Sequence, residues 1–225
     1  MNALRKLLFT LAAFAALAFA AAPAHADTVV YTTRAAFTGA VTNLTTITFE
    51  GIASPNSVAN FSSPLTLQGV TFSGSPTGMV SVVDSGFFAP LFQFNSGAVL
   101  SGFAFVEVTL PAGITAIGTD LMSTNPSGSP FQVVLSTGET FVVNTPLGPN
   151  RGFFAITTDV AIASIRFISQ PAGPNQSAGI PLIDNFTFGP AQTAAVPEPA
   201  TIVLLGTGLA GLATRARRRR RASKT

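Results

Sequence analysis

The chain has 225 residues with a formal net charge of +3, no cysteine, no tryptophan and a single histidine, His25. Because cysteine is absent and the one histidine lies near the start, the rest of the chain cannot form Ser-His-Asp or Cys-His catalytic groups or the usual zinc sites. The positive charge lies at the two ends, since residues 27–196 contain three arginines and eight acidic residues, a net charge of −5. An acidic body without a basic patch excludes nucleic-acid binding.

Residues 1–26 have the three parts of a secretory signal peptide. Two positive side chains at 5–6 precede an uncharged apolar stretch at 7–22. Ala24 and Ala26 then form a small-x-small cleavage pattern, which predicts a mature chain that starts at Asp27. The Sec translocon and signal peptidase are the expected partners of this segment, and His25 leaves with it.

Residues 27–190 are predicted to form one all-β domain. A strand near 28–32 is followed by a short helix over 33–37, with Thr33 as its N-cap and Gly39 as its stop. The further strands are short, rich in β-branched and aromatic residues, and separated by Gly, Pro, Ser and Asn. They are expected near 45–50, 64–68, 70–73, 79–83, 91–94, 97–100, 103–110, 114–121, 131–136, 139–144, 152–158, 162–168 and 182–188.

Alternation and turn residues refine this prediction. Val106 and Val108 should point to one face of their strand, opposite Glu107, because successive side chains of a strand alternate. Ile165 and Phe167 should likewise share a face. Thr137-Gly138 predicts a tight hairpin between 131–136 and 139–144. Many short strands with frequent turns favour a β-sandwich or barrel.

A linker, 191–196, leads into a three-part tail at 197–221. Val196-Pro197-Glu198-Pro199 is followed by an apolar run, 200–214, which we expect to be a helix. A basic cluster then follows, composed of Arg215, Arg217, Arg218, Arg219, Arg220 and Arg221, with Lys224 beyond it. Fifteen apolar residues would span roughly 22 Å as a helix, short of a hydrocarbon core of about 30 Å. The arginines should stop translocation and stay on the cytoplasmic side.

This order of parts resembles the PEP-CTERM sorting signal of Gram-negative bacteria, over residues 196–221. The resemblance implies a precursor anchored in the inner membrane by a single transmembrane sorting helix and cut near Pro197–Pro199 by an exosortase, a membrane cysteine protease. It also implies a destination at the cell surface or in an extracellular polysaccharide layer. An ordinary short anchor that persists is the alternative.

Four segments of the body resemble exported jelly-roll-like β-sandwich domains of the lectin or carbohydrate-binding type. They are 48–51, 69–73, 152–158 and 183–188. Such modules often hold a structural calcium ion between an early strand and the last one. The resemblance would place that ion at Glu50, Asp184 and Asn185. The alternative is that Glu50 closes a strand into a turn, while Asp184 and Asn185 bind loop backbone.

Two further possible functions, glycoside hydrolysis and sugar binding, depend on where side chains lie in space, which the sequence alone does not show. A glycosidase needs two carboxylates at a set separation, and the acids at 50, 84, 107, 120, 139, 159 and 184 are candidates by type only. The adjacent pairs Phe87-Phe88 and Phe153-Phe154 should each place one ring outward, either for sugar contact or for burial of a second face.

The leading hypothesis is therefore a non-enzymatic, exported surface or matrix protein. The alternatives are a carbohydrate-binding module with structural calcium, and a carboxylate-dependent glycosidase or lyase.

Overall fold

The computed structural model describes residues 27–87, 97–125, 129–145, 151–171, 173–174, 177–191 and 208. The chain divides into two compact units, residues 1–191 and 192–225, and in the second unit only Gly208 is described. The predicted all-β body is confirmed, because the first unit, as far as it is described, consists of strands and one short helix.

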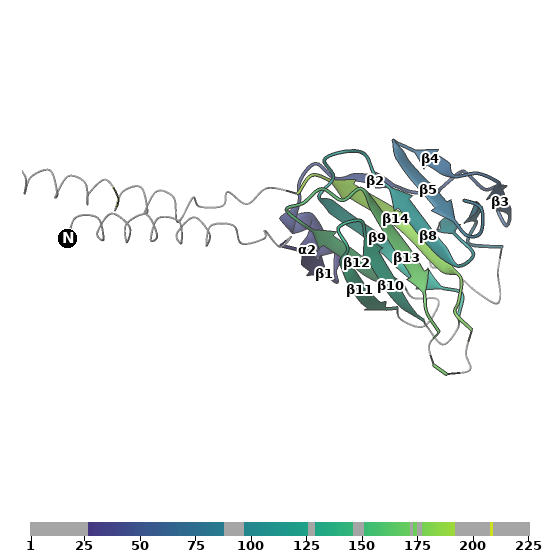
Figure 1. Ribbon diagram of the computed structural model, residues 1–225. Coiled ribbons are helices and arrows are strands. Elements are labelled where there is room, and N and C mark those ends of the chain that lie inside the picture. Colours follow the sequence, from purple (N-terminus) through teal and green to yellow (C-terminus); the bar gives the residue numbers. More distant parts are fainter. Residues whose placement is uncertain are drawn as a thin grey trace, which may run out of the picture. The chain divides into compact units, whose positions relative to one another are not determined.

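The strands of the first unit form two antiparallel sheets (Figure 1). The larger sheet has the order β1 (Val29–Tyr31), β12 (Gly152–Thr157), β9 (Ala116–Ser123), β14 (Pro181–Gly189), β7 (Val99–Ser101), β6 (Val80–Val83) and β3 (Val58–Phe61), with β2 (Thr45–Ile47) also paired to β14. The smaller sheet has the order β11 (Thr140–Asn144), β10 (Pro130–Leu135), β13 (Ser164–Ser169), β8 (Phe105–Thr109), β5 (Val70–Gly74) and β4 (Leu65–Leu67).

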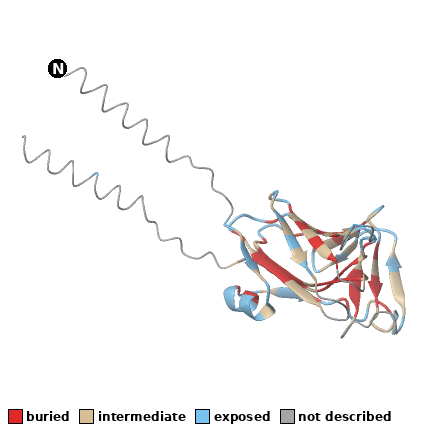
Figure 2. Ribbon diagram, turned by 90° about the horizontal axis from the view of Figure 1, so that it is seen from below, coloured by how far each residue is buried: buried red, intermediate tan, exposed pale blue. Residues whose placement is uncertain are grey.

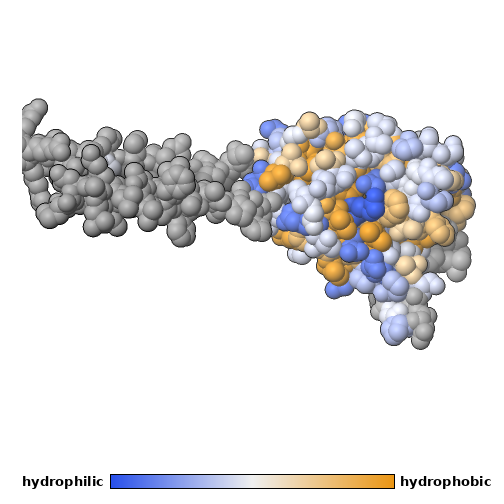
Figure 3. All heavy atoms as spheres, viewed as in Figure 1, coloured by the Kyte–Doolittle hydropathy of each residue, from blue (hydrophilic) through white to orange (hydrophobic). Residues whose placement is uncertain are grey.

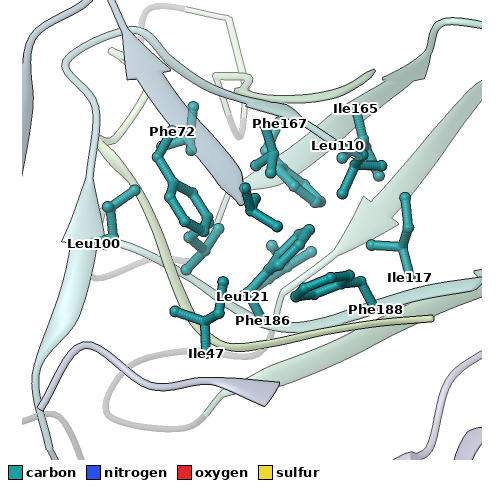
Figure 4. Packing of buried hydrophobic residues seen from close by; sticks show 14 of the residues in the cluster. Ile47, Phe72, Leu100, Leu110, Ile117, Leu121, Ile165, Phe167, Phe186 and Phe188 are labelled. Atoms are coloured by element: carbon teal, nitrogen blue, oxygen red, sulfur yellow. The ribbon is translucent and has the colours of Figure 1, made fainter. Parts of the chain in front are cut away.

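The core lies between the inner faces of the two sheets. Phe72 of the smaller sheet meets Phe186 of the larger sheet at 5.5 Å between ring centroids, and it meets Phe49 at 5.3 Å. Figure 4 shows Phe72 and Phe186 converging with aliphatic residues from both layers. Burial of each of these aromatic or branched aliphatic side chains stabilises the fold by about 1.5–3 kcal/mol. The shared core therefore holds the two sheets together as one β-sandwich.

The predicted alternation is confirmed in β8 and β13. Val106 and Val108 are buried in the core, as are Ile165 and Phe167 of the neighbouring strand. Their sequence neighbours Glu107 and Arg166 lie on the outer face, where they are register partners. The predicted hairpin between β10 and β11 is also confirmed, with Gly138 at φ 94°.

A short helix covers part of the outer face of the larger sheet. It is α2 (Arg34–Ala40), and Thr33 caps it as predicted, its side-chain oxygen accepting the N–H of Ala36. Gly39 does not end the helix. The helix continues to Ala40, and the N–H of Val41 donates the last helical hydrogen bond to the carbonyl oxygen of Phe37. Figure 2 shows α2 mostly exposed. Phe37 is its one buried side chain.

Two details differ from the expected strands. The strand β3 (Val58–Phe61) was not expected, because its four residues show no run of β-branched side chains. It is an edge strand that pairs with β6 alone. The run expected at 45–50 forms a strand only over 45–47, since the chain leaves β14 after Ile47. The strand expected near 91–94 lies outside the described residues.

Candidate functional site: a carboxylate–arginine cluster

Two carboxylates lie next to each other on the outer face of the larger sheet. Asp120 of β9 and Asp184 of β14 are direct register partners, so their side chains leave the sheet side by side. The side chain of Asp184 is only 5% exposed and that of Asp120 is 17% exposed. The strand pairing shifts directly after Asp184, where Asn185 adopts a positive φ of 49°. This bulge places Asn185 over the carboxylate pair.

Two arginines from distant parts of the chain neutralise the pair. Arg34 of α2 donates to Asp120 at 2.8 Å, and Arg151, just before β12, donates to Asp184. The side-chain amide nitrogen of Asn185 lies 2.8 Å from Asp120 and 3.1 Å from Asp184, so it bridges both carboxylates. We call these five residues the carboxylate–arginine cluster. Its two negative and two positive charges balance.

The cluster joins the helix to the sheet. The Arg34 guanidinium lies 4.7 Å from the ring centroid of Phe153, and its other nitrogen donates to Thr187 at 3.3 Å. Phe153 in turn packs on Phe37 of α2, with ring centroids 6.1 Å apart. Arg34 therefore ties α2 to three strands, β9, β12 and β14.

Burial raises the pKa of Asp184 above its ordinary value of 3.8. The backbone N–H of Asn185, 2.6 Å from the carboxylate, and the Arg151 guanidinium oppose this rise because they stabilise the ionised form. The ionised carboxylate is thus favoured by its partners and disfavoured by its surroundings. The ionised form of Asp184 therefore depends on the positive charge of Arg151.

A glycosidase would use such a carboxylate pair differently. It needs one carboxyl group free to donate a proton and another free to reach the sugar. Here Asp120 and Asp184 both have a guanidinium partner and share the amide of Asn185. The arrangement brings two candidate acids together, as the glycosidase hypothesis required, but directs both toward internal ion pairs.

The residues expected to hold calcium do not fit that ion. Asp184 is occupied by Arg151, whose charge would repel a cation, and Asn185 points its amide nitrogen at the carboxylates. Glu50 accepts the N–H of Ala98 at 2.9 Å. In the described part of the chain, no three His, Cys, Asp or Glu side chains are grouped as metal ligands.

The Glu50 carboxylate has a local structural role. Gly97 has a φ of 74°, and a Cβ atom there would lie 1.7 Å from the near oxygen of Glu50. The carboxylate therefore occupies space that only a glycine leaves open, and it fixes the turn that leads into β7. This role differs from the expected one, because Glu50 holds a turn on a distant segment and does not close its own strand, which already ends at Ile47.

The phenylalanines of the two adjacent pairs lie in different environments. Phe154 is buried in the core, with 3% of its surface exposed, and Phe153 is half-buried beneath Arg34. Phe87 is 46% exposed, and Phe88 lies outside the described residues. The most exposed aromatic ring is one that the sequence did not single out. Among the described residues it is Phe103, which is 73% exposed.

A second polar surface lies on the outer face of the smaller sheet. Arg166 donates to Glu107 at 2.6 Å, and its guanidinium lies 4.6 Å from the ring centroid of Phe105. Gln132 and Ile168 flank these residues in the same register. Figure 3 shows hydrophilic and apolar side chains interleaved on the face in view.

Sequence reasoning found Asp184 and Asn185 but missed Arg34, Arg151 and Asp120 as their partners. One signal was available, because the body has only three cations, and each has a carboxylate partner in the structure. A buried or half-buried cation in such an acidic body requires a partner. The sequence does not show which carboxylate pairs with which arginine.

The targeting residues lie almost entirely outside the described part of the chain. This holds for Ala24 and Ala26, for 196–199 and for the arginines of 215–221, while Asp27 is described. No helix among the described residues is both long and apolar enough to cross a membrane.

Three solved structures illustrate what the body is similar to. A mutant of CBM29-2, a family 29 carbohydrate-binding module, shares 14% identity and covers 69% of this chain and 98% of its own, with a TM-score of 0.32. TmCBM61 in complex with β-1,4-galactotriose shares 14% identity over 55% of this chain and 89% of its own, with a TM-score of 0.29. The K1 cleaved adhesin domain of Lys-gingipain from Porphyromonas gingivalis W83 shares 10% identity over 65% of this chain and 98% of its own, with a TM-score of 0.27.

No curated protein is similar enough in sequence to this chain to count as a relative. The tail, in contrast, matches a known family. The PEP-CTERM protein-sorting motif matches residues 195–220, which confirms the resemblance seen in the Pro-Glu-Pro, apolar and arginine segments. The chain thus carries a PEP-CTERM sorting motif at its C-terminus, following a β-rich body.

Proposed function

We propose that this chain is a non-enzymatic, exported surface or extracellular-matrix protein that is sorted through its C-terminal tail. The observation that carries the proposal is the sorting motif at residues 195–220. The leader at 1–26 would direct export of the body, and an exosortase-type protease would cut near Pro197–Pro199. The precursor would be held in the inner membrane of a Gram-negative bacterium by the helix at 200–214 until that cut.

The body supports a structural role. Its successive strands from β8 to β10 and from β11 to β14 pass back and forth between the two sheets, which is consistent with the jelly-roll-like class. The paired acids Asp120 and Asp184 are held in ion pairs, so neither is free for acid–base chemistry. After Asp27 the sequence has no histidine or cysteine to serve as a nucleophile or base.

Cell fractionation tests the sorting step. Replacing Pro197 and Pro199 by alanine in a host with an exosortase should leave the chain in the membrane fraction with its tail intact. Lys224→Ala is the matched control, since this residue lies outside the matched 195–220 and should leave sorting unchanged. Equal release of the wild-type chain and the proline variant would contradict the proposal.

A second candidate function is binding of a neutral polysaccharide on the outer face of the smaller sheet. The specific observation is the exposed side chain of Phe103, which lies in the bend that leads into β8, the strand whose outer face carries Glu107 of the Glu107–Arg166 pair. Aromatic faces pack against the C–H surfaces of sugars, while a guanidinium donates hydrogen bonds to sugar hydroxyl groups and a carboxylate accepts hydrogen bonds from them. The Glu107–Arg166 pair carries no net charge, which suits an uncharged chain of sugars.

Affinity electrophoresis in gels that contain neutral polysaccharides tests this second function. Phe103→Ala should abolish retardation, whereas Val142→Ala should not. Val142 is the matched control because it is also 73% exposed and lies on the outer face of β11 in the same sheet. If the wild-type chain is not retarded, or both variants are retarded equally, the binding hypothesis is refuted.

A further inference from the structure

The residues that follow the predicted leader are fixed to the body by polar contacts. The backbone nitrogen of Asp27 donates to the Asp159 carboxylate at 3.0 Å, and the hydroxyl of Thr28 donates to Glu139 at 2.9 Å. The strand β1 begins one residue later, where Val29 pairs with Thr157 of β12. The first residue of the predicted mature chain is thus already part of the folded body.

Removal of the leader would change the chemistry of this contact. Hydrolysis of the Ala26–Asp27 peptide bond adds one water molecule, so that Ala26 leaves as a carboxylate and the nitrogen of Asp27 becomes a primary amine. An α-amino group has an ordinary pKa of about 7.7–8.0, so it takes up a proton at neutral pH. We propose that cleavage converts the Asp27–Asp159 hydrogen bond into an ion pair between the new N-terminal ammonium group and the Asp159 carboxylate.

Charge around the site favours this ion pair. The ammonium group would face the Asp159 carboxylate, with the side chain of Asp27 itself and Glu139 nearby, and all three carry negative charge. In the described part of the chain, the arginine ion pairs use Asp120, Asp184 and Glu107, so Asp159 has no arginine partner. A charged donor adds the attraction of opposite charges to a hydrogen bond that the carboxylate acceptor already strengthens.

The contact matters because the first two residues of β1 are little buried, whereas Tyr31 at its end packs on Phe37. β1 is a three-residue strand at the edge of its sheet, and Val29 and Val30 are 46% and 44% exposed. A short edge strand with little apolar burial opens easily and depends on its polar contacts. The ion pair would therefore attach β1 more firmly in the processed chain than in the precursor. This inference rests on the export and leader removal of the proposed function.

Selective acetylation tests the ion pair directly. The sequence has two lysines, Lys6 and Lys224, so a chain that starts at Asp27 carries the α-amine and, until the tail is cut, Lys224 as its amines. Acetylation of Asp27 keeps one N–H donor but removes the charge, which reproduces the precursor amide. Hydrogen exchange of the amides of 29–31 at pH 6.5 should become on the order of threefold faster after acetylation, the size expected for an exposed ion pair.

The effect has a defined pH dependence. Pairing with Asp159 raises the pKa of the α-amino group in the folded state, so the stabilisation is present below about pH 8 and is lost as the pH rises through that raised pKa. The difference between the free and acetylated chains should vanish by about pH 10. It should also vanish in Asp159→Asn, which keeps the size of the side chain.

Glu107→Gln is the matched control, because it removes a carboxylate from an ion pair elsewhere in the body and should leave the acetylation effect unchanged. An acetylation effect that persists in Asp159→Asn, or its absence from the wild-type chain, would overturn the ion pair alone. Mass spectrometry separates this result from a failure of the proposed function. A secreted chain that begins elsewhere than Asp27 would refute the leader removal and the ion pair together.

Discussion

Replacing Arg151 by methionine should destabilise the body strongly. The side chains of Arg151 and Asp184 are only 13% and 5% exposed, so the substitution leaves a buried carboxylate without its cation and next to Asp120. Removal of one partner of a buried ion pair costs about 3–5 kcal/mol. For a domain of this size, a loss of about 3 kcal/mol lowers Tm by roughly 6–12 °C. Urea unfolding followed by circular dichroism measures the free energy of unfolding.

Arg166→Met provides the comparison. The Glu107–Arg166 pair has a similar contact but side chains that are 27% and 43% exposed, so its loss should cost at most about 1 kcal/mol. A loss for Arg151→Met that is no larger than for Arg166→Met would refute the assignment of a buried, cation-dependent Asp184.

The pH dependence gives a second check on the same variant. Burial raises the folded-state pKa of Asp184 above 3.8, so ionisation of this group disfavours the folded state. Its contribution to stability is greatest below pH 3.8 and decreases as the pH rises through the raised folded value. Without Arg151 the opposing effect of the cation is gone. The penalty of Arg151→Met should therefore shrink as the pH falls and Asp184 becomes protonated.

Three further predictions concern other contacts. Chelation with EDTA should leave Tm unchanged, whereas a rise of several degrees on adding Ca²⁺ would contradict the misfit of Glu50, Asp184 and Asn185 to that ion. Gly97→Ala should destabilise the body by about 1–3 kcal/mol, because the new Cβ would meet the Glu50 carboxylate at a positive φ; an unchanged urea midpoint would exclude the close contact. Thr33→Ala should cost about 1 kcal/mol through loss of the α2 cap, and a cost below a few tenths, measured in the same assay, would show that the cap contributes little.

Local patterns predicted the sheets well, because the relevant physics is local. The alternation of Val106, Glu107 and Val108 reports which side chains face the core without knowledge of the partner strand. Gly138 marks a hairpin because the turn itself requires a positive φ. The tail was predictable for a similar reason, since its three parts are consecutive in the sequence and match the sorting motif as one unit.

The carboxylate–arginine cluster could not be predicted, because it depends on register between distant strands. Asp120 meets Asp184 only through the pairing of β9 with β14, and the bulge at Asn185 sets where the amide points. Arg34 and Arg151 reach the pair from a helix and from the residue before β12. The partner of Glu50 could not be predicted for the same reason, because Ala98 lies on the approach to another strand.

Mass spectrometry of the chain recovered from the extracellular and membrane fractions tests the central claim most directly. We predict a mature chain in the extracellular or surface fraction that begins at Asp27 and ends near Pro197–Pro199. An intact chain that keeps its arginine-rich C-terminus and remains in the membrane fraction would contradict the claim that the tail is a processed sorting signal.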